Sequence, residues 1–561
     1  MWIKFFKFAI ILLIYQTPLY SKSNTLNAFN SRYLSNYFSG IVAYENSDNA
    51  QALKFFKLSK NLIKKHNSYL KNYIYTLVLE GKVQQATNEI KQNLTADNSD
   101  FFEAHLMLAL DSIRRKDYKK SKEQLQRSYE FIKKDRFSLI IAETLKQYLY
   151  VFEEKKILKK RNKFGNFSFI NEVFQRCYLN HKNTKTYFEN LINSKNDADY
   201  SRYTFFYLNY LIENNEFKKA KNITGDLDYL NSSLLISQGK KWMEDQRPEE
   251  FKKIFSCSNT TDILSEFFFL ISSLYASENN YEKSNFYLNI SHYLNPKFKF
   301  NLSLLAENYY INKNYSKTLK VLESFNKNDE FYYWFKLKKE TQIISKKKNK
   351  DVSLKFINLN FKKIKNPSIK IILDIANFNK NAKKYKEAIK YYDQIISQID
   401  INSELYAEIL YRRGSSYERL GDYVNSDKDL LKSLEVNPDN AYVLNYLAYS
   451  WLEREYKINF SLQMLEKAYA KESNDPYIID SIGWAYYLIN DYTKAENFLK
   501  RAVQLMPDDP VVNDHYGDIL WKLDRKIQAR YFWKNVLSLE EIGGEMKKNI
   551  KDKLNEGLSN S

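Results

Sequence analysis

A spacing of about 34 residues between small side chains constrains this chain more than any other feature of its sequence. Gly414, Ala448, Gly483 and Gly517 mark that spacing in the C-terminal half. An apolar or aromatic residue follows each of them three positions later, and a second small residue follows about twelve positions later. A fixed period of this length is typical of repeat proteins, in which neighbouring units bury a shared core. The sequence therefore predicts a stacked array of repeats.

The pattern inside each period predicts two antiparallel helices. Apolar residues recur at the i, i+3, i+4 and i+7 spacing of an amphipathic helix. Pro476 and Pro510 stand where a first helix would open, and Pro438 and Pro507 stand where a second helix would end. The whole chain of 561 residues has only 12 glycines and 8 prolines, which leaves little material for tightly turned sheets. We expect an all-α fold.

This frame resembles the tetratricopeptide repeat (TPR), so the expected architecture is a TPR α-solenoid of stacked antiparallel helix pairs. The segments Val443–Trp451, Asp480–Tyr487 and Asn513–Trp521 further resemble exported TPR proteins of alphaproteobacterial type. More distantly, the chain is similar to TPR lipoproteins that act as adaptors for periplasmic carboxyl-terminal processing proteases, although no cysteine is available for lipidation after the N-terminal apolar run. The resemblance implies a helical scaffold without catalytic residues.

Four segments are expected along the chain. Residues 1–23 have the pattern of a signal peptide, with Lys4 and Lys7 before the apolar run Phe8–Tyr15. Residues 24–264 carry degenerate TPR-like helical repeats, residues 265–543 a well-formed array, and residues 544–561 a C-terminal capping helix. The apolar run is shorter than the roughly 20 residues of a membrane-spanning helix. We expect a periplasmic protein, the alternative being an inner-membrane anchor that leaves the chain facing the periplasm.

The two cysteines, Cys177 and Cys257, have neither metal-ligand spacing nor a CxxC pairing. They are separated by more than two repeats, and a bond between them would require the solenoid to fold back sharply. We therefore expect two buried and unreactive thiols.

The formal net charge of +20 has two interpretations. Most of the basic residues are lysines, as expected for a biased base composition, and the alternative is attraction to acidic partners or an anionic membrane. The lysine-rich runs at 155–163 and 346–350 lack the interleaved aromatic residues of a single-strand nucleic-acid groove. We expect no nucleic-acid partner, and peripheral membrane association stays open.

A binding groove is expected on the first helices of the last three repeats, at frame positions 2, 5, 9 and 12. Tyrosine and tryptophan are enriched at binding hot spots, and the three aspartates would face basic groups of a peptide or partner helix. The alternative is that Trp484 and Trp521 pack between repeats as core. The predicted groove consists of Tyr442, Asn445, Tyr449, Tyr477, Asp480, Trp484, Tyr487, Asp514, Asp518 and Trp521.

No pattern in the sequence indicates chemistry. The five histidines form no HExxH pair, and GxSxG, Walker A and GxGxxG motifs are absent. We expect neither enzymatic activity nor a cofactor. The predicted function is a protein-binding scaffold or adaptor in the bacterial cell envelope. The alternative is a structural part of an envelope secretion or assembly apparatus, such as polysaccharide or pilus export.

Overall fold

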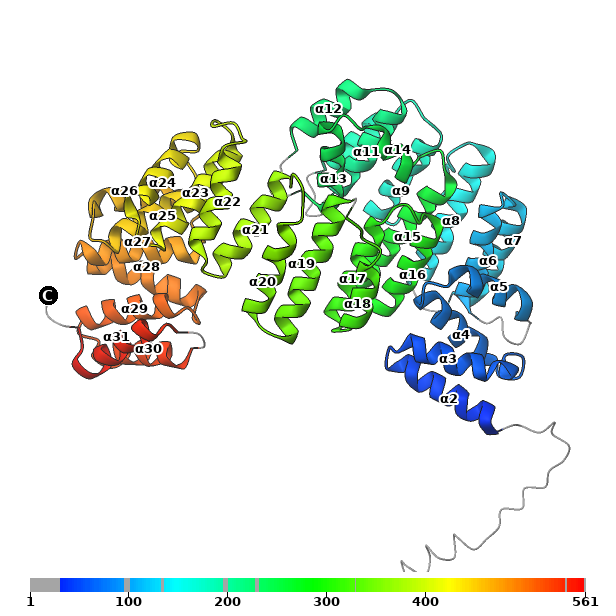
Figure 1. Ribbon diagram of the computed structural model, residues 1–561, viewed down its shortest axis with the longest axis horizontal. Coiled ribbons are helices and arrows are strands. Elements are labelled where there is room, and N and C mark those ends of the chain that lie inside the picture. Colours follow the sequence, from blue (N-terminus) through cyan, green and yellow to red (C-terminus); the bar gives the residue numbers. More distant parts are fainter. Residues whose placement is uncertain are drawn as a thin grey trace, which may run out of the picture. The chain divides into compact units, whose positions relative to one another are not determined.

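The computed structural model describes residues 31–94, 101–132, 136–194, 200–227, 232–327, 329–539 and 542–558. Within these residues every regular element is a helix, which confirms the all-α prediction (Figure 1). No helix in the described ranges combines the length and apolar character that a membrane crossing requires. The predicted signal peptide, residues 1–23, lies outside the described residues.

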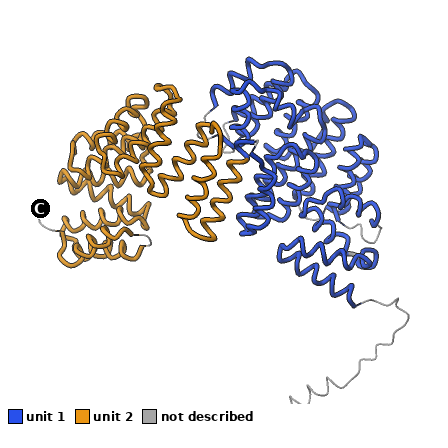
Figure 2. Tube along the Cα trace, in the orientation of Figure 1, with its two compact units in different colours: residues 1–227, 232–332 blue, residues 228–231, 333–561 orange. Residues whose placement is uncertain are grey.

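The chain divides into two compact units, and the division falls inside one helix, between Tyr332 and Tyr333 (Figure 2). The helices of unit 1 are α2 (Ser31–Glu45), α3 (Asn49–Leu58), η1 (Lys60–Leu62), α4 (Asn67–Leu79), α5 (Val83–Asn93), α6 (Phe102–Arg114), α7 (Tyr118–Ser128), η3 (Tyr129–Phe131), α8 (Arg136–Glu154), α9 (Asn166–Tyr178), α10 (Thr184–Ile192), α11 (Arg202–Glu213), α12 (Phe217–Gly225), α13 (Leu234–Glu244), α14 (Glu249–Ile254), α15 (Thr260–Ser277), α16 (Tyr281–Leu294), α17 (Phe300–Ile311) and α18 (Tyr315–Leu322).

Unit 2 begins within α19 and continues to the C-terminal helix. Its helices are α19 (Glu330–Lys347), α20 (Lys350–Phe361), α21 (Ile369–Asn381), α22 (Tyr385–Ile396), α23 (Glu404–Glu418), α24 (Tyr423–Val436), α25 (Ala441–Leu452), α26 (Ile458–Lys471), α27 (Pro476–Leu488), α28 (Tyr492–Leu505), α29 (Pro510–Lys522), α30 (Lys526–Ser538) and α31 (Gly544–Glu556).

Polar caps fix the starts of α25, α27 and α29 in unit 2, and prolines add to them at α27 and α29. The side chains of Asn440, Asp475 and Asp509 each accept hydrogen bonds from two backbone N–H groups at the starts of α25, α27 and α29. Pro476 and Pro510 occupy the first helical position, as predicted, where a missing N–H group costs nothing. These local signals explain why the sequence period locates the helices so well.

Two of the repeat glycines lie at the contact between the two helices of a pair. A Cβ atom placed on Gly483 would lie 2.8 Å from Leu499 Cγ, and one on Gly517 would lie 2.4 Å from Trp533 Nε1. Only a residue without a side chain lets α27 meet α28, and α29 meet α30, at this distance.

Unit 1 is more than a linear stack, because α15 and α16 pack back against α4, α5 and α6. Lys283 of α16 donates a hydrogen bond to the Tyr75 hydroxyl of α4 at 2.8 Å, and it forms an ion pair with Glu103 of α6. Figure 1 shows α16 beside the blue helices that precede it by some 170 to 220 residues in the sequence. The chain therefore closes on itself within this unit.

The prediction of two free thiols is wrong, because Cys177 and Cys257 form a disulfide. Both residues are buried, as expected, but their Cα atoms are only 5.5 Å apart although 80 positions separate them in the sequence. Cys177 lies at the end of α9, and Cys257 lies in the segment after α14, which packs on α11. The backbone turn that the sequence interpretation rejected is thus present in unit 1.

Candidate functional site

The first helices of unit 2 pack directly on one another, α23 on α25, α25 on α27 and α27 on α29. We call the surface of these stacked first helices the first-helix face, and all ten predicted groove residues lie on α25, α27 and α29. Stacked helix pairs present such a face as an extended binding surface. Tyr442 and Tyr477 are its most open aromatic side chains, 53% and 57% exposed.

The centre of the first-helix face is a stack of three rings. Trp484 lies against Tyr487 with ring centroids 4.6 Å apart and against His515 at 4.1 Å, nearly parallel in both cases. Tyr449, from the preceding repeat, reaches to 6.3 Å from the His515 ring. Trp484 therefore joins two repeats and keeps part of its surface open, which combines features of the groove and core interpretations.

Asp480 has its own partner within the chain. His515 Nδ1 lies 2.9 Å from Asp480 Oδ2, and both side chains are buried. Burial lowers the pKa of His515, but the neighbouring carboxylates, Asp480 above all, outweigh it and raise the pKa above its ordinary value. The result is a buried ion pair between two neighbouring repeats.

Asp514 and Asp518 share one cation, the ammonium group of Lys553. Lys553 Nζ lies 2.7 Å from Asp514 Oδ1 and 2.8 Å from both carboxylate oxygens of Asp518. Trp533 Nε1 also donates to Asp518 Oδ1 at 3.0 Å. Burial and the charge of Asp514 raise the pKa of Asp518 to about 6, although Lys553 opposes them. The sequence analysis expected a bound peptide to supply the basic partner of these two aspartates, but Lys553 of the chain itself supplies it.

The C-terminal helix α31 also covers Trp521. Gly557, with a φ of +80°, lies so close to the Trp521 ring that an added Cβ would meet ring atom Cζ2 at 2.1 Å. Ile550 of α31 is fully buried, and Met546 and Leu554 pack against the same core. The end of the first-helix face is thereby closed, whereas the part over α25 and α27 is open.

The sequence interpretation missed the two residues that pair with the aspartates of the first-helix face, His515 and Lys553. His515 stands 35 positions after Asp480, one repeat on, so the period alone could have brought the two together. Lys553 gave no such signal, because its helix has no counterpart among the repeats. Asn445 lies on the same face, and its amide oxygen is buried without a hydrogen bond among the described residues.

No group of three or more histidine, cysteine, aspartate or glutamate side chains within the described ranges has the arrangement of a metal site. The carboxylates of the first-helix face are held by a histidine and a lysine instead. The geometry on this face is suited to binding contacts.

Comparison with known families identifies the repeat. Residues 407–440 and 478–509 match the tetratricopeptide repeat model. The TPR repeat-containing protein PA4667 of Pseudomonas aeruginosa is 32% identical over 133 residues, which are 24% of this chain and 20% of that protein. The match thus spans about a fifth of the length of this curated relative.

Solved structures with similar helical arrays match about a third of the chain. MamA of Desulfovibrio magneticus is 22% identical and covers 31% of this chain and 94% of its own, with a TM-score of 0.27. The protein TTC0263 of Thermus thermophilus is 16% identical, covers 33% and 99%, and has a TM-score of 0.29. PilF of Pseudomonas aeruginosa is 15% identical, covers 34% and 85%, and has a TM-score of 0.28.

The chain therefore contains tetratricopeptide repeats, in an all-α solenoid. Repeats of this kind serve as scaffolds for contacts between proteins, and they generally do so without chemistry of their own.

Proposed function

We propose that this protein is an adaptor in the bacterial cell envelope and that it binds a peptide or partner protein on the first-helix face of unit 2. The observation that carries this proposal is the column of open aromatic side chains over α25 and α27. Tyr442 and Tyr477 occupy the same position in consecutive repeats, and both are more than half exposed. Exposed tyrosines in register offer rigid contact area with a polar tip.

The charges on the first-helix face indicate which kinds of contact a bound partner would make. Asp480, Asp514 and Asp518 each have a cationic partner inside the chain, so a bound partner gains little by neutralising them. Aromatic and hydrogen-bonding contacts with the tyrosines and with Asn445 would then dominate binding. A partner with basic side chains would have to compete with Lys553 for the two aspartates of α29.

Two observations support a location outside the cytoplasm. The N-terminal sequence has the pattern of an export signal, and unit 1 holds a buried disulfide. Disulfides persist in the oxidising periplasm and are rare in the cytosol of mesophilic bacteria. Both features fit a periplasmic adaptor, with the chain either released or kept at the inner membrane.

Affinity capture from envelope extracts tests the binding face. The baits are the wild-type protein and a Tyr442→Ala, Tyr477→Ala double variant, compared by mass spectrometry of the eluates. Tyr531→Ala is the matched control, because Tyr531 is 68% exposed on a second helix, α30, outside the face. Since all three tyrosines are largely open, the variants should remain folded.

The proposal expects partners that are retained by the wild-type and Tyr531→Ala baits and lost by the double variant. Equal eluates from all three folded baits would exclude the first-helix face of α25 and α27 as the binding surface.

A further inference from the structure

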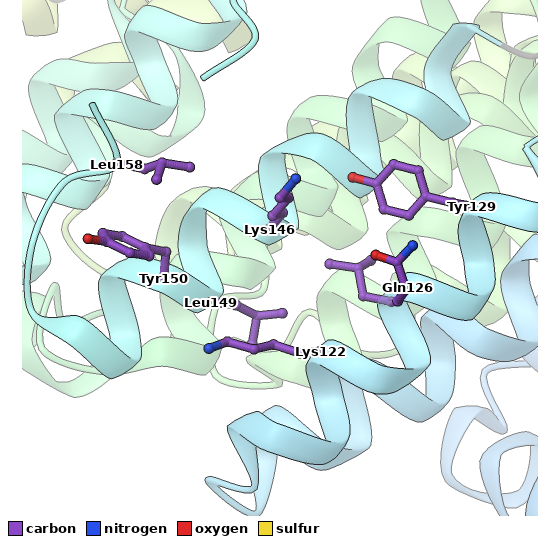
Figure 3. A pocket seen from close by; sticks show the side chains of 8 residues that line it. Lys122, Gln126, Tyr129, Lys146, Leu149, Tyr150 and Leu158 are labelled. Atoms are coloured by element: carbon purple, nitrogen blue, oxygen red, sulfur yellow. The ribbon is translucent and has the colours of Figure 1, made fainter. Parts of the chain in front are cut away.

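A separate cavity lies in unit 1 between α7 and α8. It has a volume of about 260 Å³, and most of its lining is apolar, with Leu125, Leu149 and Leu158 among its walls. Figure 3 shows the labelled lining side chains, which come from α7, η3, α8 and the segment that follows α8. The first-helix face of unit 2 takes no part in this cavity.

The cavity lies where the regular alternation of paired helices is interrupted. α8 has 19 residues, longer than the first helices of the well-formed repeats, and residues 155–165 after it form no helix. Leu158 of this irregular segment closes one side of the space. A regular second helix at this position would have filled the gap, because packed repeats leave few voids.

Two lysines, Lys122 and Lys146, line the cavity. Lys146 lines the cavity and makes no ion pair or hydrogen bond with the described residues, whereas Lys122 on the opposite wall is paired with Glu153. The irregular segment adds Lys156 and Lys159, both exposed and unpaired within the described ranges. The lysine-rich run at residues 155–163 therefore lies beside a cavity that has an unpaired ammonium group, that of Lys146.

Two neutral polar groups complete the lining. The Tyr150 hydroxyl and the Gln126 amide form no side-chain hydrogen bond with the described residues. The hydroxyl of Tyr129, in contrast, is already donated to Glu143 Oε1 at 2.5 Å. One open ammonium, one hydroxyl and one amide are therefore available near an apolar wall, and a carboxylate accepts hydrogen bonds from all three types of donor.

We propose that this cavity binds a medium-chain acyl carboxylate, with the hydrocarbon against the leucines and the carboxylate at Lys146. Binding sites for drug-sized molecules usually measure about 300–1,000 Å³, so this cavity suits a smaller ligand. The apolar walls exclude a bare anion as the best ligand, and the unpaired ammonium group of Lys146 disfavours a cation.

Calorimetric titration of the full-length protein tests the proposal with decanoate, decanol and decyltrimethylammonium as ligands. Wild-type protein should bind decanoate saturably and more tightly than decanol, and should bind the ammonium compound least. Lys146→Gln should weaken decanoate binding about fivefold, the effect of one partly exposed charge pair, and leave decanol unchanged. Lys119→Gln, at an exposed lysine of α7 outside the cavity, is the matched control and should bind as the wild type does.

A charge placed in the wall gives a second test that does not depend on Lys146. Leu158→Asp should abolish decanoate binding and strengthen binding of the ammonium compound, while Leu158→Asn should reduce all three affinities alike. Leu158 is half-buried in an irregular segment, so both variants should fold, which circular dichroism would verify. The absence of saturable decanoate binding to wild-type protein, equal affinity for decanol, or unchanged binding by Lys146→Gln would each overturn the proposal.

Discussion

Single side chains set the distances between helices in unit 2. Gly483 faces Leu499 across the α27–α28 contact, and even the backbone nitrogen of Leu499 would lie 3.1 Å from an added Cβ. Because the obstruction includes backbone, the neighbour cannot simply rotate away. Gly225, at the end of α12, has open space around it instead.

We expect Gly483→Ala to lower the free energy of unfolding by about 1–3 kcal/mol, the usual range for overpacking. Gly225→Ala should leave stability unchanged or raise it by up to about 1 kcal/mol, because alanine favours a helix. Denaturant titration of both variants provides the measurement. Equal effects from the two substitutions would contradict the close approach of α27 and α28.

The buried pair of His515 and Asp480 makes stability depend on pH. Asp480 raises the pKa of His515 in the folded state above the ordinary value of 6.5, so folding favours the protonated ring. The pair's contribution is therefore fully present below pH 6.5 and is lost as the pH rises through the folded-state pKa.

We expect the stability advantage of wild-type protein over His515→Gln to shrink between pH 6 and pH 9. The comparison of two proteins isolates this histidine, since burial lowers the pKa of His292 and gives that residue the opposite pH dependence. Urea midpoints at several pH values measure the difference. An advantage that stays constant over this range would show that folding does not raise the pKa of His515.

At the scale of whole elements, the helix α31 is held in place by few buried side chains. Only Ile550 of its residues is fully buried, and Lys553, with a side chain 12% exposed, connects it to Asp514 and Asp518 of α29. The carboxylates of α29 would be left buried without a cation if Lys553 were removed.

We expect Lys553→Met to release α31 from the repeats. Removing one partner of a buried ion pair costs about 3–5 kcal/mol, so amide hydrogens of α31 should exchange about 100-fold faster or more. Lys551→Met, at an exposed lysine of the same helix, is the control and should show wild-type exchange. Unchanged protection of α31 in Lys553→Met would mean that its apolar contacts suffice to hold it.

At the scale of the whole molecule, the disulfide should make the stability of unit 1 respond to reducing conditions, whereas that of unit 2 should not respond. It closes a loop of 80 residues inside unit 1, between α9 and the segment after α14. Constraint of the unfolded chain by a loop of this size stabilises the folded state by roughly 2–4 kcal/mol.

We expect Cys177→Ser with Cys257→Ser to destabilise unit 1 by about that amount. Hydrogen exchange of the full chain should become faster in α9, α11 and α15 and stay the same in α25 and α27 of unit 2, which serve as the internal control. Reduction of wild-type protein with dithiothreitol should give the same pattern. Unaltered exchange in unit 1 would mean that packing alone maintains its fold-back.

Much of unit 2 could be predicted from the sequence because its signals are local. Helix starts follow from Asp475 and Pro476, and the contact at Gly483 follows from the period itself. The ten predicted groove residues fall on three consecutive first helices for the same reason, since each repeat contacts mainly its neighbours. The sequence could not say which of their charges were free, because the partner Lys553 belongs to a helix outside the repeat.

By itself, then, the sequence determined the all-α repeat fold and the helices on which its regular spacing places aromatic and acidic side chains. Only the tertiary structure decided that Cys177 meets Cys257, that α16 packs on α4, and that Lys553 neutralises Asp514 and Asp518. The physical reason is the distance along the sequence between the residues that make contact. Contacts between adjacent repeats follow from a short periodic pattern, whereas contacts between distant segments depend on the curvature accumulated over many imperfect repeats, which no local pattern records.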